Sequence, residues 1–417
     1  MKSSYFIVVL IIGLLFNIKN VEANSTDIKS VIANRNRPFF PGELLVKFKS
    51  GVSTKAAQLI HGRLGVSQLR EGYENCYQII EVLPGKEKEM AKTYSKRSEV
   101  EYAEPNYYRS IYAIPNDELY PFQWHFPLIN LEEAWDISTG SGVTVAVVDT
   151  GVNPFGTDGF GSLFKSRLLR GHNAILRIPG GIDFEGHGTH VAGTIGQETN
   201  NTNGVAGIAY DANILPVKVL CLTGVGLDSW IIRGIRWATD HDADIINLSL
   251  GMHYFSQALE DAIDYAYQQG VTVVAASGNN GTGLVDYPAA FENCIAVGAV
   301  RYDKILTYYS NYGDALDLVA PGGDMKEDQN GDDLPDGVLQ ETFRFLGMGW
   351  GYYRATGTSM ASPHVAGVAA LIKSLHPEYG PDEIRQVLQE TAEDLGGPGW
   401  DHTYGYGLVD ANAAVSY

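Results

Sequence analysis

From position 143 onward, short apolar runs alternate with longer stretches in which apolar residues recur at helical spacing. The runs are almost continuously apolar, which is typical of strands buried on both faces. This alternation predicts an α/β fold, a parallel sheet with helices on both faces. We predict strands at Val143–Val148, Ala212–Leu220, Asp244–Leu250, Val271–Ala276, Ile295–Val300 and Ala315–Val319. We predict helices at His190–Gly196, Ser229–His241, Phe255–Gln269 and Ser359–Leu375.

The chain before this region has a different pattern. Residues 24–40 are polar and lack periodicity, which predicts a disordered spacer. Residues 41–113 contain a small α+β unit of about 65 residues with a ferredoxin-like arrangement, near the lower size limit for independent stability. Its predicted strands are Gly42–Lys49, Cys76–Leu83 and Val100–Ala103, and its predicted helices are Thr54–Leu64 and Lys86–Ser95.

The first 23 residues have the pattern of a secretory signal peptide. Lys2 precedes the apolar run Phe6–Phe16, and a small-residue cleavage site ends at Ala23. The alternative is a membrane anchor, but the apolar run has 11 residues, whereas a span needs roughly 20. We therefore predict a secreted protein with no membrane contact after removal of residues 1–23.

The net charge of the chain limits the kinds of molecule that we expect it to bind. The chain has 417 residues and a formal net charge of -19. An acidic surface repels phosphate backbones, so we expect no nucleic-acid partner, whereas such a surface suits cation binding.

The cysteine count is odd, so the three thiols cannot all pair. Cys76 lies in the small N-terminal unit, before the α/β region. Cys221 and Cys294 remain. We interpret them as reduced, partly buried thiols, with a disulfide between them as the alternative.

Three separate segments carry residues suited to nucleophilic hydrolysis. Val145–Gly151 contains Asp149, Gly186–Gly193 contains His187 and His190, and Gly357–His364 contains Ser359. A serine hydroxyl needs a neighbouring base to take its proton, and that base needs a third group to orient it. The chain order acid, base, nucleophile is diagnostic, because triads on unrelated folds differ in order. Spacing alone leaves both histidines as candidates for the base.

These three segments resemble those of the subtilisin-like serine proteases, the subtilase family, and the resemblance extends from about Asn116 to the C-terminus. It implies a monomeric serine endopeptidase that acts on polypeptides. Asp149 would orient His187, His187 would act as general base and then general acid, and Ser359 would be the nucleophile. His190 would be structural.

Ser359 opens a predicted helix, whose first turn offers free backbone N–H groups and a partial positive charge to an oxyanion. We place Pro363 in the same first turn, where its missing N–H is tolerated.

The resemblance also assigns residues around the substrate. Asn279 would donate its side-chain amide to the oxyanion, whereas Asn280 is interpreted as a turn residue. The two walls of the first specificity pocket would be formed by Ser249, Leu250 and Gly251 on one side, and by Ala276, Ser277 and Gly278 on the other. Asp286 falls where the base of that pocket is expected. It would favour Lys or Arg at the cleaved position, unless it is a solvated loop residue.

The position of the small N-terminal unit resembles that of the subtilase propeptide. The resemblance implies that residues 41–113 assist folding, inhibit the enzyme and are then cut off, leaving residues 114–417 as the catalytic domain. The tail Glu104–Ala113 would lie in the substrate groove like a product, with maturation between Tyr107 and Asn116. The alternative is a permanent N-terminal domain.

One acidic loop has the spacing of a calcium-binding loop. Oxygen-bearing side chains stand at its positions 1, 3, 5 and 9, as in an EF-hand; they are Asp328, Asn330, Asp332 and Asp336. Asp333 replaces the usual glycine, and Leu339 stands where a glutamate is expected, which argues for weaker binding. The alternative is a solvated acidic loop.

A second calcium site is implied by the family resemblance only. It would use Asn201 with backbone carbonyls, and Asp117 and Asp158 as carboxylate partners.

Two other functions compete with the protease. An α/β-hydrolase esterase would need Gly-x-Ser-x-Gly, but Ala361 occupies the second glycine position, and its chain order is Ser, Asp, His. A catalytically silent binding module would normally have lost a catalytic residue, and none is missing here.

Overall fold

The computed structural model describes residues 39–66, 69–70, 77–107, 114–156, 167–344, 346 and 348–417. The chain divides into two units, residues 1–111 and 112–417. The predicted signal peptide, Cys76 and Asp158 lie outside the described residues. Within the described ranges, no helix combines the length and the apolar character that a membrane crossing requires.

The first unit contains a four-stranded sheet in the order β2-β3-β1-β4. Its strands are β1 (Phe39–Phe48), β2 (Leu69–Arg70), β3 (Gln78–Glu81) and β4 (Val100–Tyr107), and its helices are α3 (Thr54–Arg63) and α4 (Glu87–Ser95). Leu44, Ile80 and Tyr94 are fully buried in its core. Strand β1 starts earlier than predicted, inside the expected spacer, because Phe39 pairs with Tyr107 on β4.

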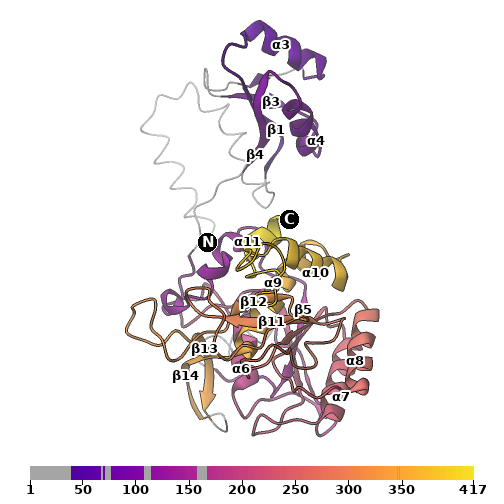
Figure 1. The fold of residues 1–417 in the computed structure, drawn as a ribbon, viewed down its shortest axis with the longest axis vertical. Coiled ribbons are helices and arrows are strands. Elements are labelled where there is room, and N and C mark those ends of the chain that lie inside the picture. Colours follow the sequence, from indigo (N-terminus) through magenta and orange to yellow (C-terminus); the bar gives the residue numbers. More distant parts are fainter. Residues whose placement is uncertain are drawn as a thin grey trace, which may run out of the picture. The chain divides into compact units, whose positions relative to one another are not determined.

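The second unit is built on an eight-stranded sheet in the order β12-β11-β10-β9-β5-β8-β6-β7 (Figure 1). All pairs are parallel except β6 with β7. The strands are β5 (Thr144–Asp149), β6 (His172–Asn173), β7 (Ile178–Pro179), β8 (Asn213–Lys218), β9 (Ile245–Leu248), β10 (Thr272–Ala276), β11 (Ile295–Val300) and β12 (Leu318–Pro321). The predicted parallel sheet is thus confirmed, and the short β6 and β7 extend it.

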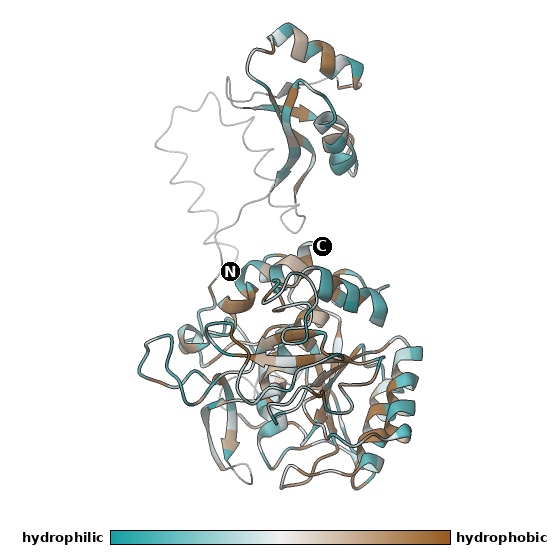
Figure 2. Ribbon diagram, viewed as in Figure 1, coloured by the Kyte–Doolittle hydropathy of each residue, from teal (hydrophilic) through white to brown (hydrophobic). Residues whose placement is uncertain are grey.

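Helices cover both faces of this sheet. Along β5, Val145 and Val147 face one apolar core, with α6 and α9, whereas Ala146 and Val148 face a second core, with α7 and α8. Figure 2 shows apolar residues along the central strands and polar residues on the outer faces of α7, α8 and α10. The helices are η1 (Tyr120–Phe122), η2 (Pro127–Ile129), α5 (Leu131–Trp135), α6 (His187–Gly196), α7 (Asp228–Thr239), α8 (Gln257–Gln268), α9 (Thr358–Leu375), α10 (Pro381–Glu390) and α11 (Ala411–Ser416).

A hairpin of β13 (Val338–Arg344) and β14 (Met348–Ala355) packs against α6 and was not predicted. Its strand β13 buries Gln340, Glu341 and Thr342. Three consecutive buried polar residues do not have the apolar pattern of a core strand, which explains why the pattern missed it.

The two cysteines of the second unit are both free thiols, as expected. Cys294 is buried, and burial raises the pKa of its thiol. Cys221 is partly exposed, and its Sγ lies 3.2 Å from the Thr223 hydroxyl.

Candidate active site

Strand β5 ends at Asp149, and helix α6 begins at His187. The Nδ1 atom of His187 lies 2.8 Å from Oδ1 of Asp149. Asp149 is fully buried, and its Oδ1 also accepts the N–H of Thr150 at 2.6 Å. Open parallel sheets have their sites beyond the carboxyl ends of the strands. Asp149, at the end of the central strand β5, occupies such a position. The pair can fix the ring so that the other ring nitrogen faces a nucleophile.

The electrostatic surroundings of His187 favour its protonated form. Burial opposes the charge, but the attraction and hydrogen bond of Asp149, followed by the charges of Glu185 and Asp183, raise the pKa of His187 to about 9. The Asp149 carboxylate would therefore stabilise the imidazolium that forms when His187 takes a proton.

His190, the competing histidine, faces the β13–β14 hairpin. Its Nε2 lies 3.1 Å from the Val338 carbonyl oxygen and 3.2 Å from that of Tyr353. Burial, followed by the charge of His187, lowers the pKa of His190 to about 4. A ring that is buried, neutral and bonded to two hairpin carbonyls joins α6 to the hairpin, which agrees with the structural role expected for it.

Ser359 is the second residue of α9. Its hydroxyl donates to the backbone carbonyl oxygen of Ser249, 3.1 Å away. In the described part of the chain this is the one hydrogen bond of the hydroxyl, so the Ser359–His187 bond is not formed here. A bond to His187 would require the hydroxyl to leave the Ser249 carbonyl oxygen. Catalytic hydrogen bonds of this kind often tighten only when substrate is bound.

Pro363 is not in the first turn, so that expectation was wrong. Helix α9 begins at Thr358, which makes Pro363 its sixth residue. Proline has no N–H, so it cannot supply the i→i−4 bond to the carbonyl oxygen of Ser359. The hydroxyl of Ser249 donates to that oxygen instead, at 2.8 Å.

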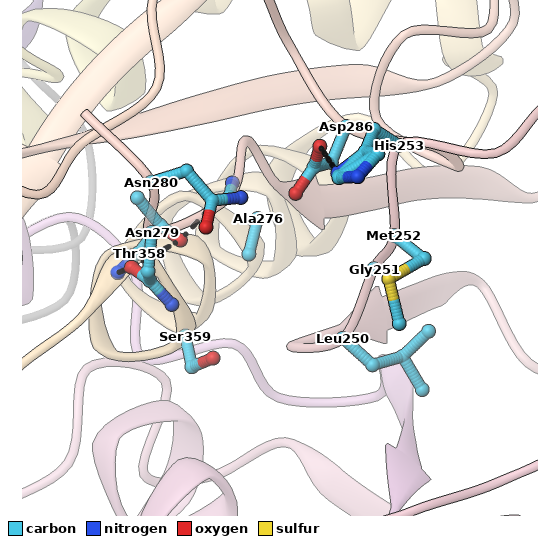
Figure 3. Close-up of a pocket in the computed structure, with 11 residues that line it drawn as sticks. Leu250, Gly251, Met252, His253, Ala276, Asn279, Asn280, Asp286, Thr358 and Ser359 are labelled. Atoms are coloured by element: carbon cyan, nitrogen blue, oxygen red, sulfur yellow. Dashed lines mark hydrogen bonds and ion pairs between the residues drawn. The ribbon is translucent and has the colours of Figure 1, made fainter. Parts of the chain in front are cut away.

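The side-chain amide of Asn279 is held through its oxygen, whereas its nitrogen is available to donate. Its Oδ1 accepts the N–H of Thr358 at 2.8 Å and the Thr358 hydroxyl at 3.0 Å. The amide nitrogen is left without a hydrogen bond among the described residues, and Asn279 is exposed at a cavity that Ser359 also lines (Figure 3). The arrangement directs a donor into the cavity that Ser359 lines.

That cavity has a volume of about 280 Å³. Five of the predicted substrate-binding residues line it together with Ser359 and Asn279; they are Leu250, Gly251, Ala276, Gly278 and Asp286. Ser249 and Ser277, the other two, are buried and do not line it. A Cβ atom on Gly251 would lie 2.9 Å from the Tyr287 carbonyl oxygen, so the wall requires glycine there.

Asp286 lies in the wall of the cavity, and its side chain is 7% exposed. Burial raises the pKa of this carboxyl, and the charge of His253 partly offsets the effect. The Nδ1 atom of His253 is 3.6 Å from Oδ1 of Asp286. A solvated loop residue, the alternative considered for Asp286, does not fit this burial.

Sequence reasoning missed the residues that support the pair Asp149 and His187. The carboxylate of Asp183 accepts the N–H groups of Glu185, Gly186 and Thr189 just before and within the first turn of α6. Lys218 is buried, and its Nζ donates to the carbonyl oxygen of Thr150 at 2.6 Å. The acidic pair Asp183 and Glu185 ahead of a helix was a readable capping signal. Nothing in the pattern marked Lys218, because it ends an otherwise apolar strand.

The acidic loop 328–336 is ordered by its own side chains. Asp328 accepts the N–H of Gly331, Asn330 that of Asp332, and Asp332 that of Leu334. Asp333 adopts a left-handed conformation, with φ of 64°. Among the described residues, no three His, Cys, Asp or Glu side chains come close enough together to hold a metal.

Asp336 departs from the rest of this loop because it is buried. Its Oδ2 accepts the N–H of Gln329 at 2.5 Å, whereas its Oδ1 is buried without a partner. Burial, together with the charges of Asp328 and Asp332, raises the pKa of this carboxyl. An orphaned, buried carboxylate oxygen in an acidic loop is the kind of group that a cation would satisfy.

Two residues of the second predicted calcium site do meet. The buried carboxylate of Asp117 accepts the N–H groups of Asn200 and Asn201 at 2.8 and 3.0 Å. The Asn201 Oδ1 accepts the N–H of Asn203 at 2.7 Å. Both carboxylate oxygens of Asp117 are therefore engaged by the loop, and Asp158 lies outside the described residues.

Comparison with known proteins agrees with this geometry. Residues 140–407 match the model of the subtilase family, and residues 25–106 match the fervidolysin N-terminal prodomain. A thermophilic serine proteinase from Bacillus sp. (strain AK1) is 36% identical over 403 residues, which cover 95% of this chain and 93% of that protein. Subtilisin Savinase from Lederbergia lenta is 42% identical over 278 residues, 66% of this chain and 92% of the relative.

Solved structures show the same likeness. A protease from Pseudoalteromonas arctica has a TM-score of 0.65 and 37% identity, covering 72% of this chain and 98% of that one. Fervidolysin from Fervidobacterium pennivorans, described as keratinolytic and related to subtilisin, has a TM-score of 0.63 and 27% identity. The match to fervidolysin covers 92% of this chain and 62% of the fervidolysin chain.

Proposed function

This chain belongs to the subtilase family and is a serine endopeptidase with an N-terminal prodomain, and we propose that Asp149, His187, Ser359 and Asn279 carry out its peptide hydrolysis. The observation that supports this assignment most directly is the 2.8 Å contact between His187 Nδ1 and Asp149 Oδ1. That bond leaves Nε2 as the ring nitrogen for proton transfer with the serine.

In the first half of the reaction, the Ser359 hydroxyl leaves the Ser249 carbonyl and transfers its proton to His187. The oxygen then attacks the carbonyl carbon of the scissile peptide. The amide nitrogen of Asn279 and the backbone N–H of Ser359 stabilise the oxyanion that develops, since the neighbouring N–H groups of Thr358, Met360 and Ala361 already have acceptors. His187 then protonates the leaving amine, which departs and leaves an acyl group on Ser359.

In the second half, His187 removes a proton from water, which attacks the acyl carbon. The same donors stabilise the second oxyanion, and His187 returns the proton to the Ser359 oxygen as the bond breaks. Throughout, Asp149 stabilises the imidazolium without itself taking the proton.

The substrate would lie between two walls of the cavity. We propose that Leu250 and Gly251 form one wall and Ala276 and Gly278 the other, while the buried Ser249 and Ser277 next to them in the chain hold the two walls in place. Support comes from the close approach at Gly251, where a side chain would meet the Tyr287 carbonyl oxygen at 2.9 Å. Such a bare backbone suits pairing with an extended peptide.

We also propose the order of maturation. Residues 1–23 direct secretion, residues 41–113 are the inhibitory propeptide, and the monomeric domain 114–417 is released by self-cleavage between Tyr107 and Asn116. The match of residues 25–106 to a prodomain supports this division. N-terminal sequencing of the purified active enzyme tests it, since a first residue outside that interval would contradict it.

For calcium, we propose the loop 328–336 as a structural site in which Asp328, Asn330, Asp332 and Asp336 close around the ion. Its support is the spacing of the oxygens and the unpartnered, buried Oδ1 of Asp336. The second predicted site keeps its oxygens engaged by backbone N–H groups. The proposal therefore centres on the loop 328–336.

Thermal unfolding of a Ser359→Ala variant in calcium and in chelator tests this site. A ligand at 100 times its Kd stabilises by about 2.7 kcal/mol, and Asp336→Asn should remove most of that gain. Asp314→Asn, which removes a charge from a side chain that is 90% exposed, is the control. Equal melting temperatures with and without calcium would contradict the proposal.

The catalytic assignment itself is tested with a fluorophosphonate, which reacts with an activated serine. The wild type should be labelled at Ser359 and lose activity in proportion, whereas Ser359→Ala should take no label. Labelling of another serine, or activity in Ser359→Ala, would contradict the assignment. Labelling of the wild type at Ser359 would also exclude the alternative of a catalytically silent binding module.

A further inference from the structure

We propose that the cavity beside Ser359 selects substrates with lysine or arginine immediately before the scissile bond, through the carboxylate of Asp286. This inference rests on the proposed function, because it takes Ser359 as the atom that attacks the substrate. It names the substrate class, which membership of the family leaves open.

The position of the cavity decides which part of a substrate enters it. Ser359 and Asn279 line one side, and Asp286 and His253 line another (Figure 3). The residue whose carbonyl is attacked holds its carbonyl carbon at Ser359 and its oxygen at Asn279. Its side chain is attached to the Cα atom bonded to that carbon, so it is the part of the substrate that reaches the cavity.

The carboxylate of Asp286 has no hydrogen bond in the described chain. Its side chain is 7% exposed, and the His253 nitrogen, 3.6 Å away, is beyond hydrogen-bond distance. Buried Asp183 has the opposite environment, because its carboxylate accepts three backbone N–H groups and the Thr189 hydroxyl. Carboxylates withdrawn from water are normally satisfied in this way. The Asp286 carboxylate is withdrawn from water, lacks a hydrogen-bond partner and faces the cavity. Its missing partner is therefore a group of the substrate that enters the cavity.

The backbone around Asp286 holds the carboxylate in place. The Asp286 N–H donates to the Ser277 carbonyl at 2.8 Å, and the Ala290 N–H donates to the Asp286 carbonyl at 3.0 Å. Gly278 has φ of +110°, and a Cβ atom on it would lie 2.4 Å from Oδ2 of Asp286. The amide nitrogen of Asn311 also approaches Gly278, but it makes no hydrogen bond to Asp286. The charge is therefore set in position before a substrate arrives, which favours selective binding.

The remaining wall suits the rest of a basic side chain. Leu250, Met252 and Ala276 present apolar groups to the cavity. Lysine and arginine pack their methylene stems on such surfaces and keep the charge at the tip. A neutral apolar side chain would cover Asp286 without pairing it, which is costly for a desolvated charge.

A set of peptides that differ only at the residue before the scissile bond tests the proposal. Norleucine has the stem of lysine without its charge, so the ratio of kcat/KM for lysine to norleucine isolates the contribution of the charge. We expect a ratio of about 10² in the wild type, because close charge pairs in such pockets contribute on this scale. In Asp286→Asn, which keeps the size of the side chain, the ratio should fall to within a few fold of one.

Asp314→Asn is the matched control, since it removes one exposed negative charge elsewhere and should leave the ratio unchanged. Titration of Ser359 with a fluorophosphonate fixes the active concentration of every preparation. A titratable wild type that cleaves norleucine and lysine peptides equally would overturn this inference alone. Absence of label at Ser359 would overturn the proposed function instead.

If Asp286→Asn fails to fold, the wild-type ratio still decides the question. If the variant folds, loses stability and keeps the wild-type ratio, Asp286 is a framework residue and the inference is wrong.

Discussion

Ser249 and Ser359 exchange hydrogen bonds: each hydroxyl donates to the other residue's backbone carbonyl oxygen, over 2.8 Å from Ser249 and 3.1 Å from Ser359. Ser249 follows β9, and Ser359 lies in the first turn of α9. The pair therefore joins the carboxyl edge of the sheet to the start of α9, which carries Ser359. The bond from the Ser249 hydroxyl to the Ser359 carbonyl oxygen also replaces the helical hydrogen bond that Pro363 cannot make.

Ser249→Ala should lower both the free energy of unfolding and kcat. The Ser359 carbonyl would lose its substitute donor, and an unsatisfied buried group costs about 1–3 kcal/mol. Denaturant unfolding in a Ser359→Ala background measures the loss without self-digestion, and kcat is measured in the active form. Ser362→Ala is the matched control, because it removes the other hydroxyl contact of Ser249, at 2.8 Å, and spares the carbonyl of Ser359. Equal effects of the two variants would refute the special role of the Ser249 bond.

Asn279→Ala should lower kcat by about 10²–10³, the usual cost of losing one oxyanion donor. KM should change far less, because the donor acts mainly on the charge that develops in the transition state. Asn280→Ala keeps the Asn279 donor and should remain within a few fold of the wild type. Steady-state kinetics on one peptide substrate checks both, and similar losses in the two variants would show that the donor is misassigned.

Activity should rise with pH toward the alkaline side. His187 must be neutral to accept the serine proton, and its neighbours raise its pKa to about 9. Glu185→Gln removes one of the negative charges that favour the imidazolium, so the apparent pKa of kcat/KM should fall and the profile should move to lower pH. Glutamine can still accept the His187 N–H that Glu185 accepts at 2.8 Å. Glu260→Gln, in the first turn of α8, is the control; a profile that shifts equally in both variants would count against the local effect.

Three buried histidines should make the fold sensitive to acid. Nδ1 of His125 and Nε2 of His364 lie 2.9 Å apart. Burial lowers the pKa of His364 to about 3, that of His190 to about 4 and that of His125 well below its ordinary value. All three are neutral in the fold, whereas the unfolded chain protonates them below about pH 6.5. Their contribution to stability is therefore complete above pH 6.5 and is lost as the pH falls toward these lowered values.

Denaturant unfolding of Ser359→Ala between pH 7 and 5 measures this loss. Each histidine can contribute a slope of about 1.4 kcal/mol per pH unit. His364→Gln should remove one such contribution, whereas His402→Gln, whose side chain is 66% exposed in the wild type, should leave the slope unchanged. A flat stability profile over this range would contradict the prediction.

The sequence predicted best those features that a short segment contains. Strand β11 has the predicted bounds Ile295–Val300, because Arg301 follows one short apolar run and the polar Asn293 lies just before it. Asp149, His187 and Ser359 could be proposed as site residues for the same reason, since each lies in a compact motif. Features that depend on residues far away along the chain could not be predicted from the sequence. Pro363 was misplaced because the group that compensates for it, Ser249, comes from 110 residues before Ser359. The β13–β14 hairpin was missed because three of its buried residues are polar, and the side chains of Gln340 and Thr342 donate to the distant carbonyl oxygens of Ala206 and Gly186.

The burial of helix α9 has a consequence for how the enzyme ages. The helix runs from Thr358 to Leu375, nearly all of its first 15 residues are buried, and it packs against β9, β10, β11 and β12. Segments packed in this way exchange their amide hydrogens only when the whole domain opens. Ser359 thus belongs to the last part of the molecule to fluctuate, while the exposed loops open first. Ser359 should keep its place for as long as the domain stays folded, and damage by other copies of the protease should begin at those loops.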